Sequence, residues 1–100
     1  MAITATLSAD QQELVIAVEG RFDFNALRDF RKAYEAQTKT PRYVLDFAKA
    51  EYLDSSALGM LLALRDYAGG DKSDVRIIHS LPDVKKILVV TKLDGLFKIE

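Results

Sequence analysis

Hydrophobic residues recur along the chain with two spacings, and the shorter spacing predicts the strands. Ile3, Ala5 and Leu7 alternate with threonine and serine, which is the period of two expected for a strand with one solvated face. Residues 13–19 are almost continuously apolar, so we expect a central strand that is covered on both faces and ends at Gly20. Shorter apolar segments predict further strands at residues 43–47, 74–79 and 96–99.

The longer spacing, of three and four residues, predicts helices between these strands. Asn25 is the expected N-cap of the first helix, and Ser80 that of the last, where Pro82 follows in the first turn. The middle helix should stop at Gly69-Gly70, where one glycine can adopt a left-handed conformation. The helices are expected at residues 25–37, 54–68 and 80–94, and a loop at residues 48–53 leads into the second of them.

This order of elements indicates the fold class. The chain reads strand, strand, helix, strand, helix, strand, helix, strand, and strands joined through a helical crossover run parallel. The first two strands are joined by a turn and should be antiparallel. We therefore expect an α/β fold whose mixed sheet has parallel central strands, one antiparallel edge and covering helices.

The middle helix has two unlike faces. Asp54, Ser55 and Ser56 open it, and all three residue types suit a helix N-cap. At 100° per residue, the inner stripe contains Ala57, Leu61, Leu64 and Ala68, flanked by Leu58 and Met60, and the opposite side contains Ser55, Gly59, Leu62 and Asp66. That opposite side suits a partner that approaches Ser55 closely. The alternative is a helix buried on both faces, with Ser55 or Asp54 serving only as a cap.

Length and charge limit the classes of function. One hundred residues suffice for one domain, residues 1–100, with its own core. Lysine plus arginine (14) nearly balance aspartate plus glutamate (15) without a basic tract, which argues against nucleic acid or an anionic membrane as a partner. Cysteine is absent, and the sequence has neither a signal peptide nor a membrane-spanning run, so we expect a cytoplasmic protein.

Several kinds of catalytic or cofactor site find little support. A serine hydrolase would combine Ser55 with His79, the only histidine, but the Gly-x-Ser-x-Gly elbow is absent. The glycines match no nucleotide-binding spacing, and His79 has no second metal ligand near it in the sequence. We therefore expect no enzyme activity, no cofactor and no metal.

A regulatory phosphoserine at Ser55 agrees better with these residues. A phosphate there would add about 1.5 to 2 negative charges at a helix N-terminus, where free N–H groups and the helix dipole stabilise them. The fold would survive the modification. Beside Asp54, the added charge would repel a partner that docks on the uncharged patch of Ser55, Gly59 and Leu62.

At these residues the chain resembles the STAS domains, and within them the bacterial anti-sigma factor antagonists. Residues 52–59, Tyr-Leu-Asp-Ser-Ser-Ala-Leu-Gly, are similar to the family signature Asp-Ser-Ser/Thr-Gly-Leu-Gly, with Ala57 in place of a glycine. Residues 19–23 and 93–97 are similar to an early and a late family element. Many relatives carry an additional C-terminal helix, for which a sequence ending at Glu100 leaves little room. We therefore expect the last strand to be either more exposed or covered by a partner.

The resemblance implies a partner switch controlled by phosphorylation. It makes Ser55 the acceptor for a serine kinase that is often also the anti-sigma factor, and a serine phosphatase reverses the modification. Asp23 and Asp54 would help to form the kinase-facing surface, and Ser56 would shape the loop. With Gly59 and Leu62, these residues are the predicted partner-binding surface. The alternative is a STAS binding module in a lipid-transport, sensory or other signalling complex without a phosphate cycle.

Overall fold

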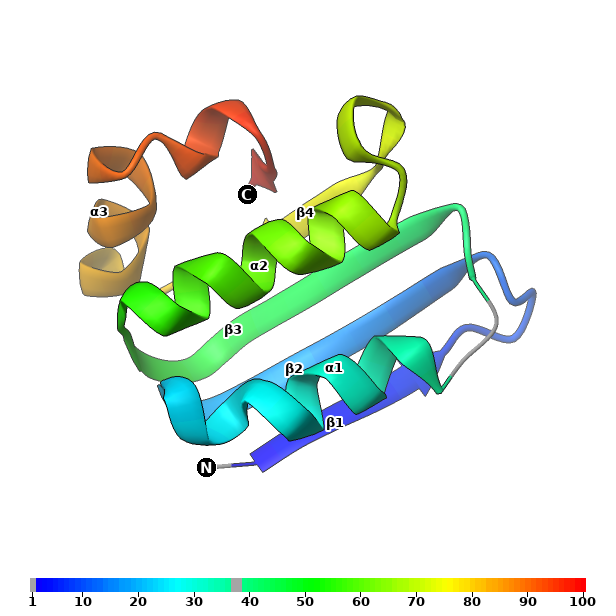
Figure 1. The fold of residues 1–100 in the computed structure, drawn as a ribbon, viewed down its shortest axis with the longest axis horizontal. Coiled ribbons are helices and arrows are strands. Elements are labelled where there is room, and N and C mark those ends of the chain that lie inside the picture. Colours follow the sequence, from blue (N-terminus) through cyan, green and yellow to red (C-terminus); the bar gives the residue numbers. More distant parts are fainter. Residues whose placement is uncertain (1, 37–38) are drawn as a thin grey trace.

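The computed structural model describes residues 2–36 and 39–100, which form one five-stranded sheet and its helices. Figure 1 shows α1 and α2 lying side by side in front of the sheet, with α3 beyond the start of α2. The strands are β1 (Ala2–Leu7), β2 (Glu13–Phe22), β3 (Arg42–Leu53), β4 (Val75–Ile78) and β5 (Lys98–Ile99), in that order across the sheet. The helices are α1 (Leu27–Glu35), α2 (Ser55–Tyr67) and α3 (Pro82–Val90), with single 3₁₀ turns at Phe24–Ala26, Gly70–Lys72 and Leu93–Gly95.

The pairing of the strands confirms the predicted fold class. β1 and β2 are antiparallel, and the β2–β3, β3–β4 and β4–β5 pairs are all parallel. The two strands of each parallel pair are joined by a connection that contains a helix, which is the usual right-handed crossover between parallel strands. The sheet is therefore mixed, with its antiparallel pair at one edge.

Only one face of the sheet is covered by helices in the described part of the chain, so the prediction for the second strand is wrong in one respect. Leu14, Ile16 and Val18 of β2 are buried in the main core, whereas Val15 and Ala17, on the other face, are only half-buried. An almost continuous apolar run is typical of a strand covered twice. Here the second face carries apolar residues and remains accessible.

Two irregularities in the pairing of β2 with β3 explain why both strands are longer than predicted. The register shifts between Ala17 and Glu19 and again between Gly20 and Arg21. Gly20 has a φ of 84°, which glycine adopts without strain, so it lies inside β2 and does not end it. The segment 48–53, predicted as a loop, continues β3 to Leu53.

The helix starts differ from the sequence prediction at two places. Asp23, and not Asn25, accepts the capping hydrogen bond, from the backbone N–H of Asn25, and a 3₁₀ turn precedes α1. The last helix has Leu81 as its N-cap and Pro82 in its first turn, while the hydroxyl of Ser80 is buried without a hydrogen-bond partner among the described residues. The predicted end of the first helix, Gln37, lies outside the described residues.

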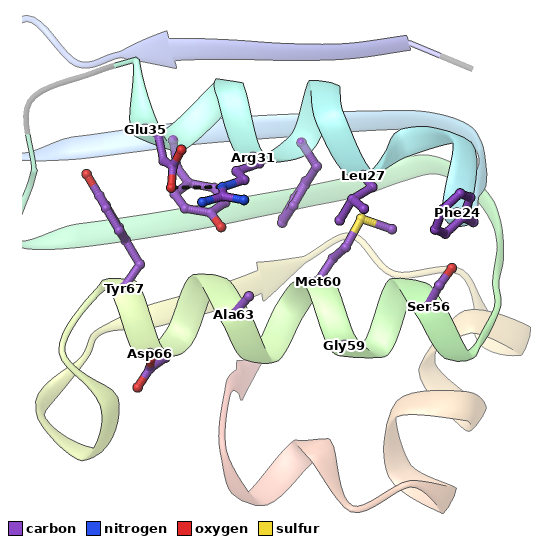
Figure 2. A pocket seen from close by; sticks show the side chains of 12 residues that line it. Phe24, Leu27, Arg31, Glu35, Ser56, Gly59, Met60, Ala63, Asp66 and Tyr67 are labelled. Atoms are coloured by element: carbon purple, nitrogen blue, oxygen red, sulfur yellow. Dashed lines mark hydrogen bonds and ion pairs between the residues drawn. The ribbon is translucent and has the colours of Figure 1, made fainter.

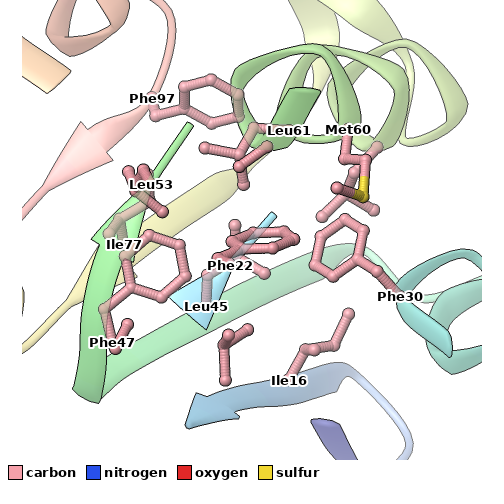
Figure 3. Close-up of a cluster of buried hydrophobic side chains, with 14 of the residues drawn as sticks. Ile16, Phe22, Phe30, Leu45, Phe47, Leu53, Met60, Leu61, Ile77 and Phe97 are labelled. Carbon is pink, nitrogen blue, oxygen red and sulfur yellow. The ribbon is translucent and has the colours of Figure 1, made fainter. Parts of the chain in front are cut away.

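The core lies between the sheet and the helices, and aromatic rings occupy its centre (Figure 3). The ring of Phe22 lies 4.9 Å from that of Phe30 on α1 and 6.1 Å from that of Phe47 on β3. Leu61 of α2 is fully buried above them. These contacts join both helices to the two central strands, and they hold the end of β2 and the start of α2 close to each other.

Candidate functional site

The site that the sequence singles out lies where β2 and β3 end. Because these strands are parallel and paired up to Phe22 and Leu53, the chain leaves both of them at one edge of the sheet. The backbone N–H of Asp54 donates to the carbonyl oxygen of Phe22 at 3.3 Å. Asp23 and Asp54 therefore follow directly on neighbouring strands, and each begins a helical segment.

Asp54 is the N-cap of α2. Its Oδ1 accepts a hydrogen bond of 2.9 Å from the backbone N–H of Ala57 and one of 2.6 Å from the hydroxyl of Ser56. The hydrogen bond from Ser56, followed by the one from Ala57, lowers the pKa of Asp54 below its ordinary value. Ser56 thus has a structural role beside Asp54, because its hydroxyl is engaged in the cap.

Ser55, in contrast, is exposed at the first position of α2. Its hydroxyl makes no hydrogen bond within the part of the chain that the structure describes. The next residue, Ser56, is half-buried and faces the gap between α1 and α2 (Figure 2). The two neighbouring serines therefore differ in both accessibility and hydrogen bonding.

The two faces of α2 have the burial that the helical wheel predicts. Ala57, Leu61 and Leu64 are fully buried. On the other side Gly59 and Asp66 are exposed, and Leu62 is 42% exposed. The alternative of a helix buried on both faces is therefore wrong. The structure brings Ser55, Gly59 and Leu62 together on one accessible surface.

Two side chains beside this site are absent from the sequence prediction. Tyr52 is the partner of Arg21 in the β2–β3 register, and the Arg21 guanidinium lies 4.4 Å from the centre of the Tyr52 ring. The Arg21 Nε also lies 4.0 Å from Oδ2 of Asp23. The adjacency of Arg21 and Tyr52 depends on the strand register, which includes two irregularities that no sequence motif reveals.

Sequence reasoning also missed a groove between α1 and α2. It has a volume of about 580 Å³ and extends from Phe24 and Ser56 at one end to Glu35 and Tyr67 at the other (Figure 2). Phe24 is 67% exposed and Leu27 is 45% exposed. The one sequence feature that could have indicated this groove is the aromatic pair that flanks Asp23.

The arrangement around His79 does not resemble a hydrolase site. His79 Nδ1 lies 3.1 Å from Oδ1 of Asp46 in the first half of β3, and no hydrogen bond joins it to Ser55 within the described ranges. Residues 2–36 and 39–100 contain no cluster of three histidine or acidic side chains that could hold a metal ion. In the same residues, no helix has the length and apolar character needed to cross a membrane.

Comparison with known proteins places these features in context. Residues 5–99 match a family model described as "Mlab, STAS domain". A STAS-domain containing protein of Pseudomonas aeruginosa (strain UCBPP-PA14) is 57% identical over 100 residues, which cover 99% of each chain.

Solved structures with the same fold include two proteins named for their regulatory roles. An anti-sigma factor antagonist STAS domain from Rhodobacter sphaeroides is 28% identical, with a TM-score of 0.59 over 78% of this chain and 85% of that one. The phosphorylated form of the Bacillus cell fate determinant SpoIIAA is 18% identical, with a TM-score of 0.69 over 99% of this chain and 91% of that one. At 18% identity the likeness to SpoIIAA shows the fold alone.

Proposed function

Since the chain belongs to the STAS domain family, we propose that it is an anti-sigma factor antagonist that switches partners when Ser55 is phosphorylated. In this proposal the unmodified protein binds an anti-sigma factor that is also a serine kinase, and a serine phosphatase restores the unmodified form. The protein acts by binding and has no catalytic site of its own. The fold that it shares with anti-sigma factor antagonists supports this function.

The observation that carries the proposal is the position of Ser55. Its hydroxyl is exposed at the N-terminus of α2, within reach of another protein, while Asp54 caps the helix without it. A phosphate on Ser55 would meet the free N–H groups and positive end of the helix, which stabilise an anion. The cap and the core do not depend on the Ser55 hydroxyl, so the fold should be the same in both forms.

Phosphorylation would change the charge of the surface that a partner contacts. We assign to that surface Asp23, Asp54, Ser56, Gly59 and Leu62, which lie at the β2 and β3 ends and on α2. A phosphate adds about 1.5 to 2 negative charges beside two carboxylates that are already there. An acidic partner surface is repelled by this concentration of like charge. An apolar partner surface is disfavoured because the phosphate would lose its hydration on contact.

Labelling with the cognate kinase tests this function directly. We expect the wild-type protein and Ser56→Ala to take up phosphate, and Ser55→Ala to take up none. In a binding assay with the anti-sigma factor, Ser55→Ala should bind as the wild type does, whereas Ser55→Asp should bind at least about tenfold more weakly because of its charge.

Two results together would contradict the proposal. The partner would bind the wild type and Ser55→Asp equally, and the kinase would place no phosphate on Ser55. Such a result would favour a STAS binding module in a lipid-transport, sensory or other signalling complex. The "Mlab" description of the matching family model is the observation that keeps this second function in view. Recovery of transport proteins with the tagged chain from its native host would support it.

A further inference from the structure

The two outer strands of the sheet differ in how well they are protected against pairing with another chain. β5, at one edge, has only two residues, and its Lys98 is paired with Asp74 at 3.6 Å. A short, charged edge strand of this kind is a poor template for a further strand. β1, at the other edge, has six residues and contains neither a charge nor a proline, in a chain of which 29% is charged. The edge of β1 is therefore suited to bind a further strand.

We propose that β1 pairs antiparallel with β1 of a second copy of this chain, so that two five-stranded sheets join into one continuous sheet. The two copies are related by a two-fold axis beside Ala5, which lies opposite Ala5 of the second copy. Three features of the edge support a second copy as its occupant, namely its free backbone groups, its side chains and the helix that covers it.

The backbone of β1 has hydrogen-bonding groups that point away from the sheet. The register between β1 and β2 runs without a shift along the whole of β1, and beyond its end the N–H of Ser8 donates to the carbonyl oxygen of Glu13. Because bonded positions alternate along an antiparallel strand, the even-numbered residues of β1 bond to β2. The N–H and C=O groups of Ile3, Ala5 and Leu7 therefore point to the free edge.

A second copy satisfies all of these free backbone groups. With Ala5 opposite Ala5 of the second copy, Ile3 lies opposite Leu7 of the second copy, and Leu7 opposite its Ile3. Residues that face each other in this way in an antiparallel pair exchange two hydrogen bonds, one from each N–H. The same three residues of the second copy thus provide a partner for every N–H and C=O group on the free edge.

The side chains of β1 are self-complementary in the same register. Ile3, Ala5 and Leu7 pack against the rim of the core but are only half-buried, and the pairing covers them with their apolar counterparts. On the open face of the sheet, the exposed Thr4 lies opposite Thr6 of the second copy, and threonine pairs across strands are favourable. Residues 2–7 are uncharged, so the two strands do not repel each other.

The helix that covers this edge leaves room for a second copy. α1 packs on β1 and β2, on the core face of the sheet (Figure 1). On a helical wheel, the side of α1 that faces away from α2 contains Ala33 and Ala36, together with Asp29 and Lys32. The two alanines allow α1 of the second copy to lie alongside. Asp29 and Lys32 carry opposite charges, so an antiparallel pair of these helices brings no excess of like charge together.

A dimer of this kind leaves Ser55 accessible. Ser55 lies at the start of α2, which packs on β3, and β2 separates β3 from the edge strand. Dimerisation and phosphorylation would therefore use different parts of the molecule, and neither proposal depends on the other. We expect Ser55→Asp to form the dimer as readily as the wild type does.

Sedimentation and amide hydrogen exchange of the full-length, untagged protein test the pairing. Sedimentation should show a reversible dimer whose share rises with concentration. The N–H groups of Ile3, Ala5 and Leu7 should exchange more slowly as the dimer forms, and those of Thr4 and Thr6 should change less, because they already bond to β2. A protein that stays monomeric at the concentrations used for NMR, or a dimer that leaves the first three N–H groups unprotected, would overturn the proposal.

Charges on the two exposed threonines test the register. Thr4→Lys with Thr6→Lys places lysines opposite each other and should weaken the dimer at least about tenfold, as should Thr4→Glu with Thr6→Glu. An equal mixture of these two variants should form a heterodimer. Thr4→Glu with Thr6→Lys in one chain places opposite charges across the interface and should dimerise as the wild type does.

A matched pair of charge changes far from the edge provides the control. Lys85→Glu with Lys86→Glu, on the exposed side of α3, should leave dimerisation unchanged, and a loss of the dimer in that variant would contradict an interface at β1. Equal dimerisation of all the threonine variants would overturn the proposed register. If the N–H groups of Ile3, Ala5 and Leu7 become protected only when another protein is added, the edge binds a foreign strand and the proposal of a second copy fails.

Discussion

Two adjacent serines at the start of α2 have different environments, and this difference arises from a single carboxylate. Oδ1 of Asp54 accepts hydrogen bonds from both the Ala57 N–H and the Ser56 hydroxyl, whereas the Ser55 hydroxyl has no hydrogen-bond partner among residues 2–36 and 39–100. A motif that contains two serines cannot say which of them is accessible. The sequence predicts the helix start and the cap type here. The helical backbone after Asp54 turns successive Cβ atoms by about 100°, so the two serine side chains leave α2 on different sides.

The pKa of Asp54 gives a pH prediction at the residue scale. Because the folded-state pKa lies below the ordinary value of about 3.8–3.9, the cap stabilises the fold above that pH, and the contribution is lost as pH falls through the folded pKa. In Ser56→Ala the largest cause of the shift is removed, so the pKa of Asp54 should rise toward its ordinary value. A carboxyl NMR titration measures this.

The difference in thermal stability between wild type and Ser56→Ala should accordingly shrink as the pH falls through the lowered, folded-state pKa of Asp54, because the carboxyl group then becomes protonated in both proteins. Ser55→Ala is the control, because its hydroxyl does not contact Asp54, and it should leave the titration unchanged. An unaltered Asp54 pKa in Ser56→Ala would contradict the hydrogen bond on which this argument depends.

At the scale of the element, α2 is predicted well because its signals are local. The three-and-four spacing of Ala57, Leu61 and Leu64 identifies the buried stripe, and Gly69 ends the helix region with a φ of 124°. The end of β3 is predicted poorly, since Phe47, Ala50 and Leu53 are buried at every third residue. That spacing results from the register shifts against β2, which involve a strand far away in the sequence.

Gly59 should separate the stability of α2 from its ability to bind. Gly59→Ala removes a helix-interior glycine where the new methyl group meets open space, so the free energy of unfolding should rise by about 0.5–1 kcal/mol. The same methyl group lies on the proposed partner surface and should weaken binding. Chemical denaturation and a binding titration on one preparation measure both effects.

Gly95→Ala is a useful comparison, because its added Cβ atom also meets nothing within 4 Å and it lies outside α2, in the 3₁₀ turn at Leu93–Gly95. We expect that variant to bind the partner as the wild type does. A Gly59→Ala variant that is both more stable and fully active in binding would show that no partner approaches this part of α2 closely.

For the whole molecule, the sequence predicts the order of elements and hence which strands run parallel, because strands joined by crossovers through helices are parallel. It does not predict that one face of the sheet stays open. Val15 and Ala17 are apolar in the sequence, yet α1, α2 and α3 all pack on the opposite face. Which face a crossover helix covers follows from the handedness of the connection. In this chain every crossover between neighbouring strands leads to the same face.

Neighbouring leucines on α2 test whether the core and the partner surface are separate. Leu61 is 0% exposed within the core cluster, and Leu62 is exposed beside it. Leu61→Ala should lower the free energy of unfolding by about 2–5 kcal/mol, whereas Leu62→Ala should change it by less than about 0.5 kcal/mol and weaken partner binding. Urea denaturation and a binding titration measure the two effects. Comparable losses of stability in both variants would contradict the separation.

Asp23 and Asp54 follow directly on the paired ends of β2 and β3. This attachment limits how far a change at the start of α2 can alter the rest of the domain. The segment that would carry the phosphate in the proposed switch is fixed to the two central strands and to the aromatic cluster beneath them. Amide hydrogens of Leu14, Ile16 and Leu45 should therefore exchange with deuterium at the same slow rate before and after modification. In the proposed switch, phosphorylation changes the charge of the surface and leaves the core as it was, so the signal passes only to a partner protein that binds this surface.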